Sequence, residues 1–557
     1  MFILVLLTGA LGLAAFSWAS IAFFSLYLAP RRSSLYNLQG PDHTNYFTGN
    51  FLDILSARTG EEHAKYREKY GSTLRFAGIA GAPVLNSTDP EVFNHVMKEA
   101  YDYPKPGMAA RVLRIATGDG VVTAEGEAHK RHRRIMIPSL SAQAVKSMVP
   151  IFLEKGMELV DKMMEDAAEK DMAVGESAGE KKATRLETEG VDVKDWVGRA
   201  TLDVMALAGF DYKSDSLQNK TNELYVAFVG LTDGFAPTLD SFKAIMWDFV
   251  PYFRTMKRRH EIPLTQGLAV SRRVGIELME QKKQAVLGSA SDQAVDKKDV
   301  QGRDILSLLV RANIAANLPE SQKLSDEEVL AQISNLLFAG YETSSAVLTW
   351  MFHRLSEDKA VQDKLREEIC QIDTDMPTLD ELNALPYLEA FVKESLRLDP
   401  PSPYANRECL KDEDFIPLAE PVIGRDGSVI NEVRITKGTM VMLPLFNINR
   451  SKFIYGEDAE EFRPERWLED VTDSLNSIEA PYGHQASFIS GPRACFGWRF
   501  AVAEMKAFLF VTLRRVQFEP IISHPEYEHI TLIISRPRIV GREKEGYQMR
   551  LQVKPVE

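Results

Sequence analysis

The chain has 557 residues and a formal net charge of −13, which argues against a nucleic-acid-binding protein because phosphate binding needs a basic surface. Its hydrophobic content of 45% and charged content of 26% are ordinary for a globular fold with a large core. The three cysteines, Cys370, Cys409 and Cys495, are too few and too scattered for a disulfide framework, which favours a reducing compartment.

The first 29 residues carry no charged side chain and are mostly apolar. A helix needs roughly 20 such residues to cross a bilayer. A cleaved signal peptide is the alternative, but the apolar run is long for one, and neither a basic leader nor a clear cleavage site accompanies it. Arg31 and Arg32 follow, and the positive-inside rule places them in the cytosol. We predict a transmembrane anchor over residues 1–29, a tether over 30–60 and one large domain over 61–557.

Local signals predict the first elements of this domain. A helix is expected from Glu62 to Tyr70, where Gly71 ends it. The segment from Thr73 to Leu85 suits a hairpin, since glycines and a proline break its apolar runs. Asp89-Pro90 combines an N-cap with a first-turn proline and predicts the start of a helix.

Helical periodicity dominates the middle of the chain. Two charged stretches, 165–190 and 288–303, hold few large apolar residues and are expected to be surface insertions. Strand-like alternation returns near the C-terminus, at 433–435, 440–443 and 547–553. The predicted fold class is therefore mainly α with a minor β-sheet.

A long helix is predicted from Ser325, which forms a capping box with Glu328, to about Leu355. Its middle reads Ala339-Gly340-Tyr341-Glu342-Thr343. Glycine inside a helix costs about 1 kcal/mol, and an acid in an apolar run is also unfavourable. The unremarkable alternative is a partly exposed glutamate beside a threonine that bonds back to its own helix.

Glu394 and Arg397 lie three positions apart on a predicted helix and face one another. An exposed pair of this kind recurs by chance and contributes well under about 1 kcal/mol. A second arginine, Arg466, follows within the segment 462–467, which lies between this helix and the last cysteine.

The segment from Phe488 to Gly497 holds Cys495 between Gly491 and Gly497 in a loop. A lone cysteine is usually a small buried hydrophobe, and this alternative fits Cys370 and Cys409. An apolar helical pattern follows the loop from 499 to 513, so the positive end of a helix should point at the sulfur. We expect this dipole to lower the thiol pKa.

The pattern F-x-x-G-x-R-x-C-x-G, complete at Phe488–Gly497, resembles the haem-binding signature of the cytochrome P450 monooxygenases. The resemblance extends from about Asn45 to the C-terminus, with four motifs in the family's order. It implies the cytochrome P450 fold and haem b with Cys495 as the axial thiolate ligand of the iron. Phe488, Gly491 and Gly497 would shape the sulfur's surroundings, and Arg493 would pair with a haem propionate.

The resemblance also assigns the other motifs. Ala339 and Gly340 would leave room for dioxygen, while Glu342 and Thr343 would help to deliver protons during its activation. Glu394, Arg397 and Arg466 would form a buried structural ion network.

Further haem contacts are implied by the helix that begins near Gly126. His129, which stands where the family often has tryptophan, and Arg133 would bind a propionate, as would Arg407 farther along the chain. The alternative for all three is a solvated basic surface.

The implied function is insertion of one oxygen atom from O2 into a lipophilic small molecule. The protein would cross the membrane of the endoplasmic reticulum once and hold its catalytic domain in the cytosol. A separate NADPH-cytochrome reductase would supply electrons, and cytochrome b5 is a possible second donor. Residues 130, 131 and 134 would form the patch on which the reductase docks. A terpenoid, steroid or polycyclic aromatic is expected, in secondary metabolism or xenobiotic oxidation. The aromatic residues of 228–253 would line the substrate pocket or simply pack. A fatty-acid hydroxylase, a reductase-independent haem-thiolate isomerase and a non-catalytic haem sensor are the alternatives.

Overall fold

The computed structural model describes Ser17 and residues 33–45, 48–171, 189–219, 221–233, 261–289, 304–307, 309, 323–469, 474–531 and 533–556. The predicted anchor, Ser17 apart, therefore lies outside the described residues. So does most of the aromatic part of 228–253.

The described helices are α3 (Phe51–Ser56), α4 (Glu61–Tyr70), α5 (Pro90–Lys98), α6 (Gly107–Thr117), α7 (Gly126–Met136), α8 (Ala142–Asp171), α10 (Val193–Phe210), α11 (Glu223–Asp233), α13 (Glu261–Ser289), α15 (Asp326–Glu357), α16 (Lys359–Ile369), α17 (Leu379–Asn383), α18 (Pro386–Leu398), α19 (Leu445–Ile448), α20 (Lys452–Tyr455) and α21 (Trp498–Arg515). The described strands are β1 (Thr73–Ala77), β2 (Pro83–Ser87), β3 (Val191–Asp192), β4 (Ala405–Glu408), β5 (Glu413–Ile423), β6 (Val429–Thr436), β7 (Met440–Leu443), β8 (Val516–Pro520), β9 (Tyr527–Thr531), β10 (Ser535–Ile539) and β11 (Arg550–Pro555). Single 3-10 turns include η3 (Ile137–Leu140), η6 (Pro464–Trp467), η8 (Ala486–Phe488) and η9 (Gly491–Arg493).

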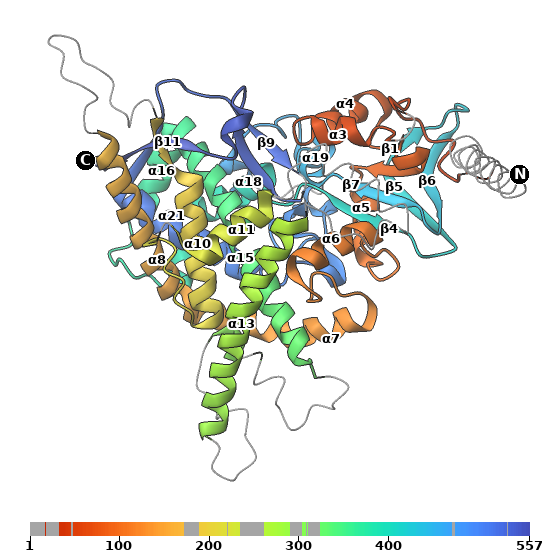
Figure 1. Ribbon diagram of the computed structural model, residues 1–557. Helices are drawn as coiled ribbons and strands as arrows, with labels where there is room; N and C mark the ends of the chain where they lie inside the picture. Colours follow the sequence, from red (N-terminus) through yellow and green to blue (C-terminus); the bar gives the residue numbers. More distant parts are fainter. Residues whose placement is uncertain are drawn as a thin grey trace, which may run out of the picture.

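The molecule divides into a helical part and a sheet-rich end (Figure 1). In the helical part, α15 packs on α10, α13 and α21, and their apolar side chains form the largest core. At the sheet-rich end, β1, β2, β7 and β4 form one sheet in that order, beside the β5–β6 hairpin. Smaller sheets pair β9 with β10 and β11 with β8 and β3. The mainly α prediction with a minor sheet is confirmed.

Most local predictions are confirmed because their signals are local. Gly71 ends α4 at φ 94°, a conformation that glycine adopts without steric cost. Asp89 caps α5 by accepting from the amides of Glu91 and Val92. Ser325 and Glu328 form both bonds of the capping box that begins α15.

One local prediction is wrong. The expected insertion at 165–190 begins too early, because α8 continues to Asp171 with Ala167 buried in the core. The segment 30–60, predicted as a tether, contains helix α3, which buries Ile54 and whose Asp53 accepts a hydrogen bond from Thr44 at 2.6 Å. Within the described part of the chain, no individual helix has the length and hydropathy of a membrane span. One pair, Gly126–Leu140 with Ala142–Asp171, bent by 56°, reaches the length and composition only when taken together.

Candidate active site

The cysteine loop is built by backbone contacts around two left-handed residues. The amide of Cys495 donates to the carbonyl of Phe488 at 2.9 Å, which closes the loop just before α21. Ile489 has φ 49° and Gly491 has φ 67°. A Cβ atom on Gly491 would lie 2.1 Å from the carbonyl oxygen of Met97. The loop can therefore pack against the end of α5 only if residue 491 is glycine.

Replacing Gly491 with alanine is therefore expected to distort the loop and to lower the stability of the protein by roughly 1–3 kcal/mol, since it combines a strained φ with a backbone clash. The measurements are the melting temperature and the haem content per chain, both of which should fall. Gly107→Ala in α6 is the matched control, because a Cβ there meets nothing within 4 Å. Equal melting temperatures for the two variants would contradict this account of the loop.

The Cys495 thiol differs from its prediction. Burial raises its pKa, while the amides of Gly497 and Trp498 and the charge of Arg133 act in the opposite direction and do not outweigh it. The expected net lowering of this pKa is thus wrong, although the amides at the start of α21 act in the expected direction. Cys495 keeps accessible surface, so a ligand can reach its sulfur.

Cationic side chains gather on the same side of the molecule as this loop. Arg493 donates to the carbonyl oxygens of Ala100 and Ala124, each at 3.3 Å, and pairs with the Glu125 carboxylate. Arg133 donates to the Ala494 carbonyl at 2.6 Å. Together with three further residues these make a group that we call the cation cluster: Lys105, His129, Arg133, Arg407 and Arg493.

The members of the cation cluster disfavour one another's charge. Burial lowers the pKa of Lys105 to about 7, and Arg407 and Arg493 act in the same direction. Burial, followed by Arg493, lowers the pKa of Arg407 to about 10. Glu125 acts in the opposite direction on both groups, and within the described residues no other acid is seen to do so. Such an excess of buried positive charge is stabilised by an anionic ligand, and two carboxylates would suit it.

The three predicted propionate residues therefore lie with Arg493 in one cluster. Arg407 is 4% exposed, and its buried Nε has no hydrogen-bond partner among the described residues. His129 is buried, and its Nδ1 lies 3.1 Å from the hydroxyl of Tyr101. Burial lowers the pKa of His129 to about 3, so the ring is neutral at physiological pH. With Tyr101 donating to Nδ1, the His129 Nε2–H remains available to an anion.

The acid–alcohol pair lies midway along α15. The Thr343 hydroxyl donates to the Ala339 carbonyl at 2.6 Å, as the unremarkable alternative supposes. Glu342 is 5% exposed and does not fit that alternative. Arg536 of β10 donates from Nε to its carboxylate at 2.7 Å, so a buried ion pair joins the middle of α15 to a strand 194 positions away.

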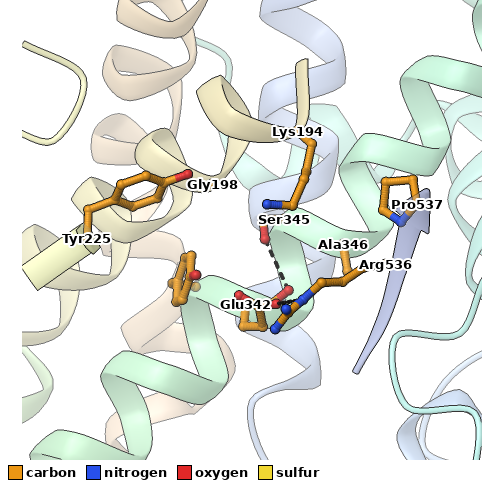
Figure 2. Close-up of a pocket in the computed structure, with 9 residues that line it drawn as sticks. Lys194, Gly198, Tyr225, Glu342, Ser345, Ala346, Arg536 and Pro537 are labelled. Carbon is orange, nitrogen blue, oxygen red and sulfur yellow. Dashed lines mark hydrogen bonds and ion pairs between the residues drawn. The ribbon is translucent and has the colours of Figure 1, made fainter. Parts of the chain in front are cut away.

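This ion pair forms one wall of a small pocket between α10, α11, α15 and β10 (Figure 2). Figure 2 shows the Arg536 side chain directed at Glu342, whereas the Tyr225 hydroxyl points toward Gly198 of α10. The Tyr225 hydroxyl donates to the Asp195 carboxylate at 2.9 Å. The pocket is lined by Lys194, Gly198, Tyr225, Tyr341, Glu342, Ser345, Ala346, Arg536 and Pro537.

Gly340 has a role that its prediction did not include. A Cβ on this residue would lie 2.4 Å from the sulfur of Met205, so the absent side chain lets α10 approach α15 closely. The structure thus assigns Gly340 to helix packing, and its place beside dioxygen stays a prediction.

Replacing Arg536 with methionine is expected to leave the Glu342 carboxylate buried without a cation and to cost about 3 kcal/mol of stability at neutral pH. Urea unfolding at neutral pH measures this loss.

The control for this variant is Arg538→Met on the same strand. Arg538 is 25% exposed, and its partner Glu528 keeps a second cation, Arg58, at 3.3 Å. This variant should lose less than about 1 kcal/mol. An equally small loss in Arg536→Met would contradict the predicted role of the ion pair.

The structure brings the side chains of Glu394, Arg397 and Arg466 together. Glu394 accepts two hydrogen bonds from Arg397, at 2.8 and 2.9 Å, and lies 3.5 Å from Arg466. The side chains of Glu394 and Arg397 are fully buried. Arg397 also donates to the carbonyls of Asn449 and Ala459, which ties α18 to the loop leading toward Cys495.

Other predicted residues contribute to packing or to ion pairs within the fold. Phe228 of α11 is 1% exposed and stacks on Tyr341 with ring centroids 5.6 Å apart, so the packing alternative holds for it. Phe488 is buried beside Tyr482. Arg131, a residue of the proposed docking patch, pairs with Glu328 at the start of α15 and so takes part in an ion pair within the fold.

Sequence reasoning missed Lys105 and Arg536 as site residues. Neither lies in a recognisable local motif, and each acts on a group far away in the chain. A basic residue before α6 and an arginine inside a short C-terminal strand were the available signals, and both are too common to be specific.

An accessible thiol on a glycine loop, a neighbouring cluster of buried cations and an acid–alcohol helix fit haem held by a cysteine and by its propionates. The site thus defines a haem-thiolate protein. The comparisons agree: the cytochrome P450 family model matches residues 38–539. The chain belongs to the cytochrome P450 family.

Curated relatives match over nearly their full length. The chain is 36% identical over 551 residues to cytochrome P450 monooxygenase 205 of Postia placenta, covering 98% of this chain and 97% of the relative. It is 32% identical over 558 residues to cytochrome P450 monooxygenase claU of Ampulloclitocybe clavipes, covering 97% and 96%. The protein is a monooxygenase, and its cofactor is haem with a cysteine thiolate ligand. When bound, the haem supplies the chemistry that activates dioxygen.

Proposed function

We propose that this monooxygenase inserts one oxygen atom into a bulky lipophilic molecule, such as a terpenoid, steroid or polycyclic aromatic, at the surface of the endoplasmic reticulum. The pair of buried Glu342 and half-buried Thr343 carries the proposal, because oxygen insertion consumes protons and an isomerase or a sensor has no such requirement. The Glu342 carboxylate reaches a polar pocket, whereas Thr343 holds its hydroxyl toward Ala339 on the same helix.

The membrane location rests on the uncharged segment Met1–Ala29 and on the two arginines that follow it. Electrons are proposed to come from a separate NADPH-cytochrome reductase, with cytochrome b5 as a second donor. Lys130 offers one exposed charge for docking such a partner, and its ammonium lies over the Tyr101 ring at 4.8 Å.

The test is a reconstitution of the full chain with NADPH-cytochrome reductase in lipid vesicles. A panel of terpenoids, steroids, polycyclic aromatics and fatty acids is first screened for spectral shifts of the haem, and the compounds that bind are then incubated with NADPH and isotopically labelled dioxygen. One labelled oxygen atom in the product, dependent on NADPH and reductase, supports the proposal. Conversion without NADPH or label would favour the isomerase, and labelled fatty acids alone would favour the hydroxylase.

A further inference from the structure

The β9–β10 hairpin carries Arg536 and forms a two-stranded sheet. A hairpin of two strands is at best marginally stable by itself, so contacts of its side chains must fix its position. His529 and Ser535 lie on one face of it, since Thr531 is the register partner of Ser535 and follows His529 by two positions. Arg536 points to the opposite face. A contact that holds Ser535 therefore also sets where Arg536 lies.

A chain of hydrogen bonds runs from Ser535 into the core through His529 and Asp399, and we call these three residues the relay. The His529 ring joins the other two, with Nδ1 2.8 Å from the Ser535 hydroxyl and Nε2 3.1 Å from the Asp399 carboxylate. Arg354 of α15 donates twice to Asp399, at 3.0 and 3.1 Å. Asp399 and Ser535 are each 1% exposed. The relay thus ties β10 to α15 inside the protein.

The charges of the relay set the direction of its hydrogen bonds. Burial favours the neutral form of Asp399, but the Arg354 guanidinium and the bond from His529 outweigh it and hold the pKa of Asp399 well below its usual range. Burial lowers the pKa of His529 although Asp399 acts in the opposite direction, so the ring is neutral at physiological pH. An ionised carboxylate can only accept, so Nε2 of His529 carries the proton and Nδ1 accepts from the Ser535 hydroxyl.

The hairpin is fastened to α15 at two points. Trp350 stacks on the His529 ring, with centroids 3.8 Å apart and 18° between the planes. Glu342, which lies eight positions earlier and so roughly 12 Å away along the helix axis, accepts the bond from Arg536 at 2.7 Å. The Thr59 hydroxyl also donates to the His529 carbonyl, at 2.9 Å, but this bond fastens β9 rather than β10. The relay is thus the side-chain link that holds the strand of Arg536.

We propose that His529 is a positioning residue of this monooxygenase: by joining Ser535 to Asp399 it fixes β10 and so holds Arg536 on the Glu342 carboxylate. His529 acts through Arg536 and is not itself a group of the reaction. Its effect on catalysis rests on the proposed function, in which Glu342 helps to deliver protons, whereas its effect on the position of Arg536 does not.

The first test compares urea unfolding of the full-length, haem-loaded variants. Arg536→Met should lower the urea midpoint of a His529→Leu protein by less than half of the shift that it causes in the unaltered protein, because the ion pair is already weakened. Ser535→Ala removes the same link with a smaller change in volume, and it decides the question if His529→Leu does not fold. His529→Gln, which keeps a donor and an acceptor, should restore much of the full shift. Equal shifts in all backgrounds would overturn the proposal.

Tyr527→Phe is the matched control on the same strand. The Tyr527 hydroxyl donates to the Arg550 carbonyl at 2.9 Å, so this variant weakens the hairpin away from Ser535. Arg536→Met should keep its full effect on the midpoint in this background. A shift that is reduced here as well would mean that any weakening of the hairpin releases Arg536, and the particular role of His529 would be wrong.

Turnover separates this inference from the function on which it rests. The assay uses the panel compound that the unaltered protein labels fastest in the vesicle reconstitution. His529→Leu should lower kcat roughly tenfold or more with a smaller change in KM, and adding it to Arg536→Met should lower kcat no further. Non-additive midpoints with an unchanged kcat would keep the position of Arg536 and overturn the role of Glu342 in proton delivery. Additive midpoints with additive losses of kcat would overturn the inference and leave the proposed function standing.

Discussion

Replacing Cys495 with serine is expected to abolish monooxygenase activity and the reduced carbon-monoxide difference spectrum typical of a thiolate ligand. A serine hydroxyl is a weaker donor than sulfur and stays protonated in a buried site, so the axial ligand is lost while the loop keeps its shape. The hydrogen bond from the Cys495 backbone amide to the Phe488 carbonyl does not involve the side chain and should persist. The measurements are the difference spectrum and the haem content of the purified protein.

Cys370→Ser is the control for this variant. Cys370 is also a free, exposed cysteine, and it ends α16 away from the cation cluster. Its replacement should change neither spectrum nor activity. A Cys495→Ser protein that keeps a thiolate-type spectrum would refute the assignment of the ligand. The raised pKa of Cys495 adds a second expectation: without haem, its thiol should react slowly with alkylating reagents at neutral pH, since the thiolate is the reactive form.

The parts of the fold that sequence could predict depend on neighbours in the chain. The capping box at Ser325, the stop at Gly71 and the pairing of Glu394 with Arg397 each involve residues within a few positions of one another. The cysteine loop is similar, since its glycines and its closing bond lie within ten residues. Such features follow from backbone geometry and need no knowledge of the rest of the molecule.

The parts that sequence could not predict depend on contacts across the fold. Arg536 reaches Glu342 only because β10 lies along α15, and the sequence around either residue gives no sign that the two are in contact. Position 340 has no room for a side chain, because Met205 of α10 occupies the space beside it. The error over the Cys495 pKa has the same origin. The helix dipole is visible in the sequence, whereas the burial that outweighs it is a property of the assembled core.

Glu394→Gln is expected to cost about 3–5 kcal/mol of unfolding free energy, because it leaves Arg397 fully buried without its counter-charge. Arg466 keeps the carboxylate of Asp458 at 2.8 Å. The Glu394 carboxylate accepts hydrogen bonds from Arg397, from the Trp467 indole at 2.9 Å and from the Arg463 amide at 2.9 Å. Glutamine can satisfy some of these donors but carries no charge. Urea unfolding of the haem-loaded protein should show the loss as a lower midpoint with an unchanged slope.

The matched control is Glu465→Gln in the adjacent turn η6, since Glu465 pairs with Lys364 at 2.6 Å but both side chains are more than a third exposed. Solvent screening should limit that loss to under about 1 kcal/mol. The double variant Glu394→Leu with Arg397→Leu discriminates further. It removes one charge of each sign, so it should be more stable than Glu394→Gln if unpaired charge is the cause. If instead the double variant is the less stable, packing and the carbonyl bonds of Arg397 hold this region together, and the ion pair is secondary.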